Sequence, residues 1–406
     1  MPETGSLSPE INEQLETVGT ADVVIGVPAL QNSEDLHWAT ELAGIGQRVV
    51  IAFPKTVPSV DSSQLAGPQF LRYEFTSGDR HLNPPTSLDG SFLEVFQISQ
   101  RVGAKCCCVW NGNPQDLTFE VIERLVAPAL KEGFDLVTPC YLEKKFGSLV
   151  NGSIVYPALR ALYGKKISFS MAIDLAFSAQ FVDRLLQVDP KTRRTRWQQW
   201  IATEAICAGL KICQVNLPVE PPRPPESADV SSILTIVLGR LFSDLERNAA
   251  YWQRSNGSLP VTTFGEAVRR EERAEVAVDV QPMIETFQLG YRNLREIWNL
   301  ALPPATLVDL KKLTMLPATT FRMPDDLWVR VIYDFALAHR QRSINREHLL
   351  RAMTPLYLGW VASHAQELKD APPSAVRANL ESLALAYERQ KPYLLSRWRW
   401  PDRFNP

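Results

Sequence analysis

The sequence lacks the features that mark membrane, secreted and nucleic-acid-binding proteins. None of its apolar runs approaches the roughly 18 residues that span a bilayer. Residues 1–20 are polar and have no apolar core of a signal peptide. The 43 basic and 45 acidic residues leave a net charge of −2, so no global field attracts nucleic acid or an anionic membrane. We therefore expect a soluble protein without nucleic-acid or membrane partners.

Cysteine and histidine spacings typical of zinc sites are also missing. The six cysteines include the adjacent triplet Cys106–Cys108, and the other three, Cys140, Cys207 and Cys213, are flanked by apolar residues. No CxxC or Cys/His cluster occurs. Because neighbours on a strand point to opposite faces, the triplet cannot bridge internally. We expect reduced, packing cysteines and hence a cytoplasmic protein.

Length and composition indicate a globular protein of two domains. The 406 residues exceed the size, about 250–300 residues, at which a single apolar core stops growing. Hydrophobic residues make up 45% and charged residues 22%, which is ordinary for a folded chain with a real core.

Strand-like and helix-like segments alternate through the first third of the chain. The predicted order is strand 22–28, helix 34–46, strand 48–53, helix 91–102, strand 106–110, helix 118–132 and strand 134–138. A strand, a helix and a second strand form a parallel crossover unit. The alternation therefore predicts an α/β domain with a mostly parallel sheet.

Prolines concentrate at 218–227, too densely for a helix or a central strand, and the pattern changes beyond them. Long helical periodicity follows at 230–247, 284–302, 328–342, 345–359 and 375–393, with a helix cap predicted at Asn345. We predict a flexible tail at 1–20, an α/β domain at 21–217, a Pro-rich linker at 218–229 and an all-α C-terminal domain at 230–406.

The apolar run Lys105–Trp110 breaks abruptly into Asn111-Gly112-Asn113. Many nucleotide-sugar transferases hold their metal with Asp-x-Asp at the end of a buried strand, and here both acidic positions are Asn. Amide oxygens can ligate hard cations but bring no charge, so Mg²⁺ or Mn²⁺ affinity should fall sharply. Three interpretations stay open: a type I′ turn, which Asn-Gly favours, a substrate-facing amide, and true metal ligation.

Seven blocks along the chain share their order and spacing with one family. They are Phe134–Tyr141, Tyr156–Ile167, Trp200–Ala205, Gly209–Gln214, Met323–Trp328, Tyr333–Ala336 and Leu356–Gly359. In these blocks the chain resembles bacterial glycosyltransferases related to mannosylglycerate synthase and glucosyl-3-phosphoglycerate synthase. The resemblance covers nearly the whole ordered chain. It implies a Rossmann-like GT-A domain with a parallel-rich sheet, followed by a helical domain.

The resemblance also implies six site residues. Asp174 and Gln198 are the catalytic residues, and the residues that bind the nucleotide sugar are Pro28, Asn32, Asn111 and Asn113, the last two at the position of the metal motif. Asp174 aligns with the carboxylate of the family's Gly-Gly-Asp/Glu loop beside the sugar, although a helix-capping or salt-bridged Asp is the favoured interpretation. Asn32 can instead cap the helix predicted at 34–46. Gln198 stands where relatives carry an acceptor-side Asp.

Several family features are changed in this sequence. The metal-binding His of relatives aligns with Pro222, and the Gly-Lys-Gly phosphate contact appears as Leu88-Asp89-Gly90. The Asp of the nucleotide-binding turn is missing from Phe53–Thr56. The basic run Lys191–Arg196 is the one substitute for a phosphate contact, unless it is a solvated surface loop. The metal ligands of the family are therefore not retained, and we expect no metal cofactor.

Two functions remain in competition. The first is an active, metal-independent transferase that moves a hexose from a nucleotide sugar to a small acidic acceptor such as glycerate or phosphoglycerate. The second is a non-catalytic relative that regulates or scaffolds an active paralogue, as a homodimer or as that paralogue's partner. Coordinated change at the metal, phosphate and acceptor positions favours the second.

Overall fold

The computed structural model describes residues 7–32, 36, 38–42, 48–57, 69–73, 88–142, 144–187, 197–222, 229–266 and 278–399, with the backbone alone for 88–91 and 197–200. The chain divides into two compact units. Unit 1 comprises Met1–Leu142, Ile167–Arg223 and Val261–Arg270, and unit 2 comprises Glu143–Lys166, Pro224–Pro260 and Glu271–Pro406. The division differs from a single boundary at 218–229, because Glu143–Lys166 precedes that boundary yet belongs to unit 2. Val261–Arg270 follows it yet belongs to unit 1.

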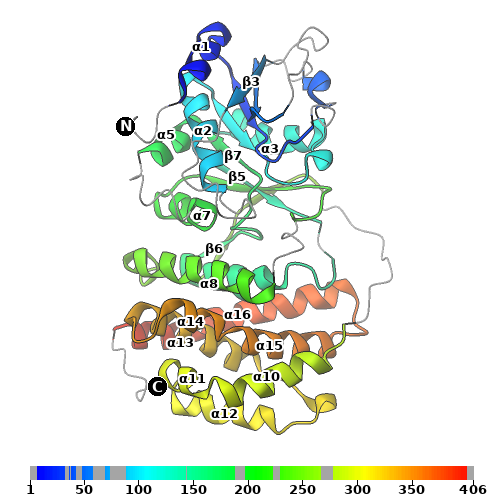
Figure 1. Cartoon of the computed structure of the whole chain (residues 1–406), viewed down its shortest axis with the longest axis vertical. Coiled ribbons are helices and arrows are strands. Elements are labelled where there is room, and N and C mark those ends of the chain that lie inside the picture. Colours follow the sequence, from blue (N-terminus) through cyan, green and yellow to red (C-terminus); the bar gives the residue numbers. More distant parts are fainter. Residues whose placement is uncertain are drawn as a thin grey trace. The chain divides into compact units, whose positions relative to one another are not determined.

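Unit 1 is built on an eight-stranded sheet with the order β10-β8-β5-β7-β4-β1-β2-β3 (Figure 1). The strands are β1 (Val23–Gly26), β2 (Val49–Pro54), β3 (Gln69–Tyr73), β4 (Cys106–Val109), β5 (Leu136–Cys140), β7 (Leu175–Ser178), β8 (Ile212–Asn216) and β10 (Thr262–Phe264). All neighbours pair in parallel except β7, which runs antiparallel to β4 and β5. The predicted α/β fold with a parallel-rich sheet is confirmed.

Helices cover both faces of this sheet. On one side lie α2 (Leu88–Arg101) and α5 (Ala179–Leu186), and on the other lies α3 (Phe119–Lys131) (Figure 1). Gly26 permits close packing of α2, since a Cβ there would lie 2.6 Å from Val95 Cγ2. Every residue of β1, β2 and β4 is buried, which explains why they read as continuous apolar runs.

Some elements of unit 1 depart from the sequence-based expectation. Residues 9–18, expected as part of a flexible tail, form α1 (Pro9–Val18), which Ser8 caps and which buries Ile11 and Leu15. The helix expected at 34–46 lies largely outside the described residues, and 38–42 form a 3₁₀ turn. Strands β3, β7, β8 and β10 were not predicted. The tail prediction is therefore wrong for 9–18.

Unit 2 is helical in its described residues, apart from the two-residue pairing of β6 (Lys165–Lys166) with β9 (Leu259–Pro260). Its helices are α4 (Tyr156–Tyr163), α8 (Val230–Arg247), α9 (Ala249–Trp252), α10 (Gln281–Asn293), α11 (Arg295–Ala301), α12 (Pro304–Thr314), α13 (Asp325–Gln341), α14 (Arg346–Arg351), α15 (Thr354–Glu367) and α16 (Pro373–Arg399). The helical C-terminal region and the Asn345 cap are confirmed. Among the described helices, none has the length and apolarity of a bilayer span.

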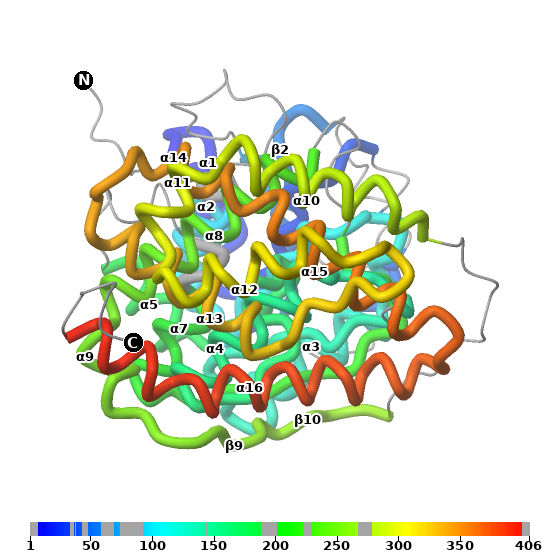
Figure 2. The backbone as a smooth tube through the Cα atoms, turned by 90° about the horizontal axis from the view of Figure 1, so that it is seen from below, coloured from blue at the N-terminus to red at the C-terminus, as the bar shows by residue number. Residues whose placement is uncertain are grey.

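The longest helix, α16, packs beside α4 and α13 (Figure 2). Arg160 of α4 is 2% exposed and contacts Glu381 and Glu388 of α16 at 2.5 and 2.7 Å. Lys391 of α16 donates to three backbone carbonyls, those of Ala161, Leu162 and Ser255. The stretch Glu143–Lys166 is thereby held within unit 2, although it leaves and rejoins unit 1 between β5 and β7.

Candidate functional site

The strand topology brings two distant segments together at one edge of the sheet. Strand β4 ends at Val109, whose partner in the antiparallel register is Leu175, the first residue of β7. Because β7 runs opposite to β4, the residues before Leu175 face the residues after Val109. Asp174 therefore lies against the turn Asn111–Asn113, at the edge where β5 also ends.

Asp174 is the centre of this site. Its carboxylate is fully buried and accepts hydrogen bonds at Oδ1 from the backbone N–H groups of Asn111, at 2.7 Å, and Gly112, at 2.8 Å. The Tyr141 hydroxyl, directly after β5, donates to Oδ2 at 2.6 Å. One carboxylate thus fastens three segments of unit 1: the ends of β4 and β5 and the start of β7.

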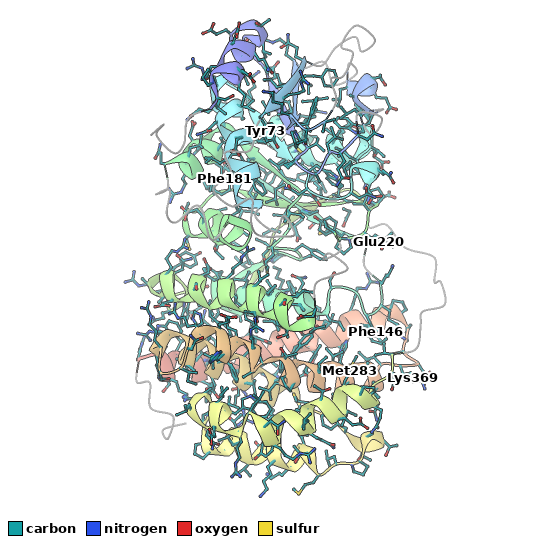
Figure 3. The ribbon with its side chains drawn as sticks, viewed as in Figure 1. Tyr73, Phe146, Phe181, Glu220, Met283 and Lys369 are labelled. Atoms are coloured by element: carbon teal, nitrogen blue, oxygen red, sulfur yellow. The ribbon has the colours of Figure 1, made fainter. Side chains whose placement is uncertain are left out.

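The environment of this carboxylate changes its acidity. Burial raises the pKa of Asp174 to about 6, because the charged form loses its hydration. The hydrogen bonds from Tyr141, Gly112 and Asn111 lower the pKa, while the negative charge of Asp116 raises it. The pKa of Asp116 is itself raised by burial and by Glu220, which follows β8 (Figure 3). Asp174, Asp116 and Glu220 make this edge of the sheet acidic.

The two asparagines use their side chains within the turn. Asn111 Nδ2 donates to the Ile173 carbonyl at 2.9 Å, and Asn113 Oδ1 accepts from the Gln115 backbone N–H, capping a short 3₁₀ helix. Asn113 is exposed, whereas Asn111 Oδ1 is buried and has no hydrogen-bond partner within the described residues. The Trp110 indole donates to the Asn113 carbonyl at 3.0 Å.

Two sequence-based interpretations of this turn are corrected. A type I′ turn needs positive φ at both central residues, and neither Asn111 nor Gly112 has one. Asp174 caps no helix and pairs with no cation in the described part of the chain. Both corrections have the same cause: the carboxylate of Asp174, directly before β7, accepts from the N–H groups of both Asn111 and Gly112.

The remaining predicted site residues lie apart from this cluster. Pro28 is half-buried in the turn after β1, and Asn32 is exposed a few residues later. The backbone of Gln198 is in α7 (Trp197–Cys207), and its side chain is outside the described part. The same holds for the side chains of 88–90 and for all of Lys191–Arg196. Their roles remain predictions.

Tyr141, Asp116 and Glu220 were missed as site residues. Tyr141 ends the first block that carries the family resemblance, so its position was a usable signal. The sequence contained no such signal for Asp116 and Glu220, because their proximity depends on where β4 and β8 end.

This donor set does not fit a divalent cation. Within the described ranges, no three His, Cys, Asp or Glu side chains come together as a metal site. The buried carboxylate has both oxygens occupied, and the Asn113 oxygen is used as a cap. Hard cations take oxygen ligands that remain available, preferably charged ones.

Asp174 should give unfolding a specific pH dependence. Its folded pKa lies above the unfolded value of 3.8, so its protonated form favours the folded state, and this stabilisation is lost as pH rises through about 6. Between pH 4 and pH 7 the wild type should therefore lose up to about 3 kcal/mol of unfolding free energy that Asp174→Asn keeps, because the Asn side chain does not ionise. Urea unfolding of both proteins across this range measures the change. A difference in unfolding free energy that stays constant from pH 4 to pH 7 would contradict the prediction.

Comparisons with known proteins give limited similarity. No protein-family model and no curated protein sequence matches the chain. Among solved structures, glucosyl-3-phosphoglycerate synthase from Mycobacterium tuberculosis in complex with phosphoglyceric acid has 17% identity and a TM-score of 0.29, covering 58% of this chain and 82% of its own. The same enzyme with Mn²⁺, UDP-glucose and phosphoglyceric acid has 16% identity and a TM-score of 0.29, covering 59% and 84%.

Proposed function

We propose that the chain is a glycosyltransferase-like protein that has lost metal-dependent sugar transfer. One observation carries this: the carboxylate at the centre of the candidate site is fully buried and saturated by internal donors. A transferase that uses a nucleotide diphosphate must stabilise the departing diphosphate, usually with a divalent cation held by accessible carboxylates. Asp174 supplies no accessible oxygen for this.

The asparagines do not replace the missing charge. Asn111 is anchored through Nδ2 and Asn113 through Oδ1, so the turn is shaped by its own bonds. Without Lewis-acid assistance, the transition state loses several kcal/mol of stabilisation. The role we favour is regulation or scaffolding of an active paralogue, as a homodimer or as that paralogue's partner in the cytoplasm.

Substrate binding and turnover test this directly. UDP-glucose and phosphoglyceric acid, which a similar structure contains together with Mn²⁺, are the natural probes. We expect no Mn²⁺-dependent rise in melting temperature and no glucosyl transfer to glycerate or phosphoglyceric acid. A ligand at about 100 times its Kd would raise the free energy of unfolding by about 2.7 kcal/mol, and a melting curve can detect this change.

An active transferase, run in parallel, provides the control for reagents and detection. Robust turnover by this chain with any common nucleotide sugar would overturn the proposal. Turnover without Mn²⁺ would favour the metal-independent transferase instead.

A further inference from the structure

Three hydrogen-bond donors converge on one point at the edge of the sheet. They are the backbone N–H groups of Asn111 and Gly112 and the hydroxyl of Tyr141, at 2.7, 2.8 and 2.6 Å from the Asp174 oxygens. Successive backbone N–H groups that point to one atom form an anion-binding concavity. In open α/β sheets, ligands bind outside the carboxyl ends of the strands, which is where these donors lie.

The absence of a side chain at Gly112 leaves room for the carboxylate beside the donors. Gly112 has no side chain, and a Cβ there would lie 3.3 Å from Asp174 Oδ2 and 3.1 Å from the Trp110 ring. Larger residues would crowd the carboxylate. The Asn111 side chain, fixed to the Ile173 carbonyl at 2.9 Å, holds the loop that carries Asp174 against the turn.

We propose that these three donors form an oxyanion-binding site and that Asp174 is an internal plug that fills it. The ligand class is a small oxyanion, either a planar carboxylate or the tetrahedral oxygens of a phosphoryl group. With Asp174 in place, the chain satisfies its own donors and excludes an external anion. This inference stands without the proposed loss of transfer, because it concerns occupancy of the N–H groups and not catalysis.

Removal of the plug provides the test. Asp174→Ala deletes the carboxylate and leaves the three donors unpaired around a carboxylate-sized space. Formate should then bind, shift the amide resonances of Asn111 and Gly112, and raise the melting temperature. At ten times its Kd, formate should increase the ratio of folded to unfolded protein about tenfold. Inorganic phosphate, assayed in parallel, distinguishes the two ligand geometries, and binding of either anion supports the site.

Two further variants keep the test sharp. Asp174→Asn retains an oxygen that can accept both N–H bonds, so the site stays full and formate should have no specific effect. Adding Tyr141→Phe to Asp174→Ala removes one donor and should weaken formate binding at least several-fold. If Asp174→Ala does not fold alone, the yield of folded protein against formate concentration gives the same readout.

Chloride at equal ionic strength controls for general salt effects. The proposal fails if formate and phosphate stabilise wild type, Asp174→Ala and Asp174→Asn equally. It also fails if the amides of Asn111 and Gly112 do not respond to either anion in Asp174→Ala, because water alone then fills the vacated space.

Discussion

Arg397→Met is expected to lower the free energy of unfolding by about 3–5 kcal/mol, since it leaves a buried charge without its partner. Arg397 and Asp334 are 3% and 0% exposed, and the guanidinium Nη1 contacts Asp334 Oδ1 directly. After the substitution, the Tyr393 hydroxyl remains near both carboxylate oxygens, at 2.8 and 3.0 Å. A neutral hydroxyl cannot replace the cation that contacts the carboxylate in this buried site.

The cost should depend on pH. Burial raises the pKa of Asp334 to about 7 even with Arg397 nearby, and losing Arg397 should raise it further. A carboxyl group with a raised folded pKa contributes stability below its unfolded pKa and loses it as pH rises. The penalty of Arg397→Met should therefore be larger at pH 8 than at pH 5. Urea unfolding at both values measures it.

Two controls separate the buried charge from a general loss of packing. Arg351 forms an exposed pair with Glu347, with 60% and 61% of the side chains exposed, so Arg351→Met should cost less than about 1 kcal/mol. Asp334→Leu combined with Arg397→Met removes both charges and should recover most of the lost stability. A double variant as unstable as the single one would refute the assigned cause.

Helix α8 was predictable from sequence because it buries one face. The apolar residues Leu234, Leu238, Leu241 and Leu245 recur at helical spacing on α8, and the predicted and observed ranges agree. A break between two helices cannot be located from sequence when the helical periodicity continues through it. The segment predicted as one helix at 284–302 is in fact α10 followed by α11. Tertiary packing decides such breaks.

Short or exposed strands left no comparable signal. In β10, two of three residues are exposed, and β3 has an exposed first residue, so neither forms an apolar run. The hydrogen bonds between Asp174 and the turn depend on the antiparallel register of β4 with β7. This is a long-range pairing that local sequence patterns do not encode. The sequence therefore identified Asn111 and Asp174 separately but not the contact between them.

Asn111→Asp should destabilise the protein by about 3 kcal/mol at pH 8, because it places a second carboxylate against a buried one. The substitution replaces the Nδ2–H that donates to the Ile173 carbonyl with an oxygen that faces it. It also adds negative charge beside Asp174, whose pKa burial already raises to about 6. Urea unfolding of the variant and the wild type measures the loss.

The exposed neighbour offers a matched control. Asn113 caps the following 3₁₀ helix through Oδ1, and Asp caps as well as Asn, so Asn113→Asp should change stability by less than about 0.5 kcal/mol. In an Asp174→Asn background, the cost of Asn111→Asp should fall by about 1.5–3 kcal/mol, since one of the two charges is absent. Additive effects of the two substitutions would show that the carboxylates do not interact.

The turn Asn111–Asn113 can be given the Asp-x-Asp sequence of a metal site by two substitutions. Asn111→Asp with Asn113→Asp introduces Asp-x-Asp in sequence, yet the side-chain oxygen at position 113 still caps the 3₁₀ helix, so we expect at most weak Mn²⁺ binding by calorimetry. Adding Asp174→Asn removes a neighbouring negative charge, so Mn²⁺ binding should not become stronger. We expect no transfer to glycerate or 3-phosphoglycerate, because Gln198, the residue that we predict on the acceptor side, has no carboxylate. Markedly stronger Mn²⁺ binding by the triple variant would contradict this expectation, and turnover by either variant would show that the rest of the site is intact.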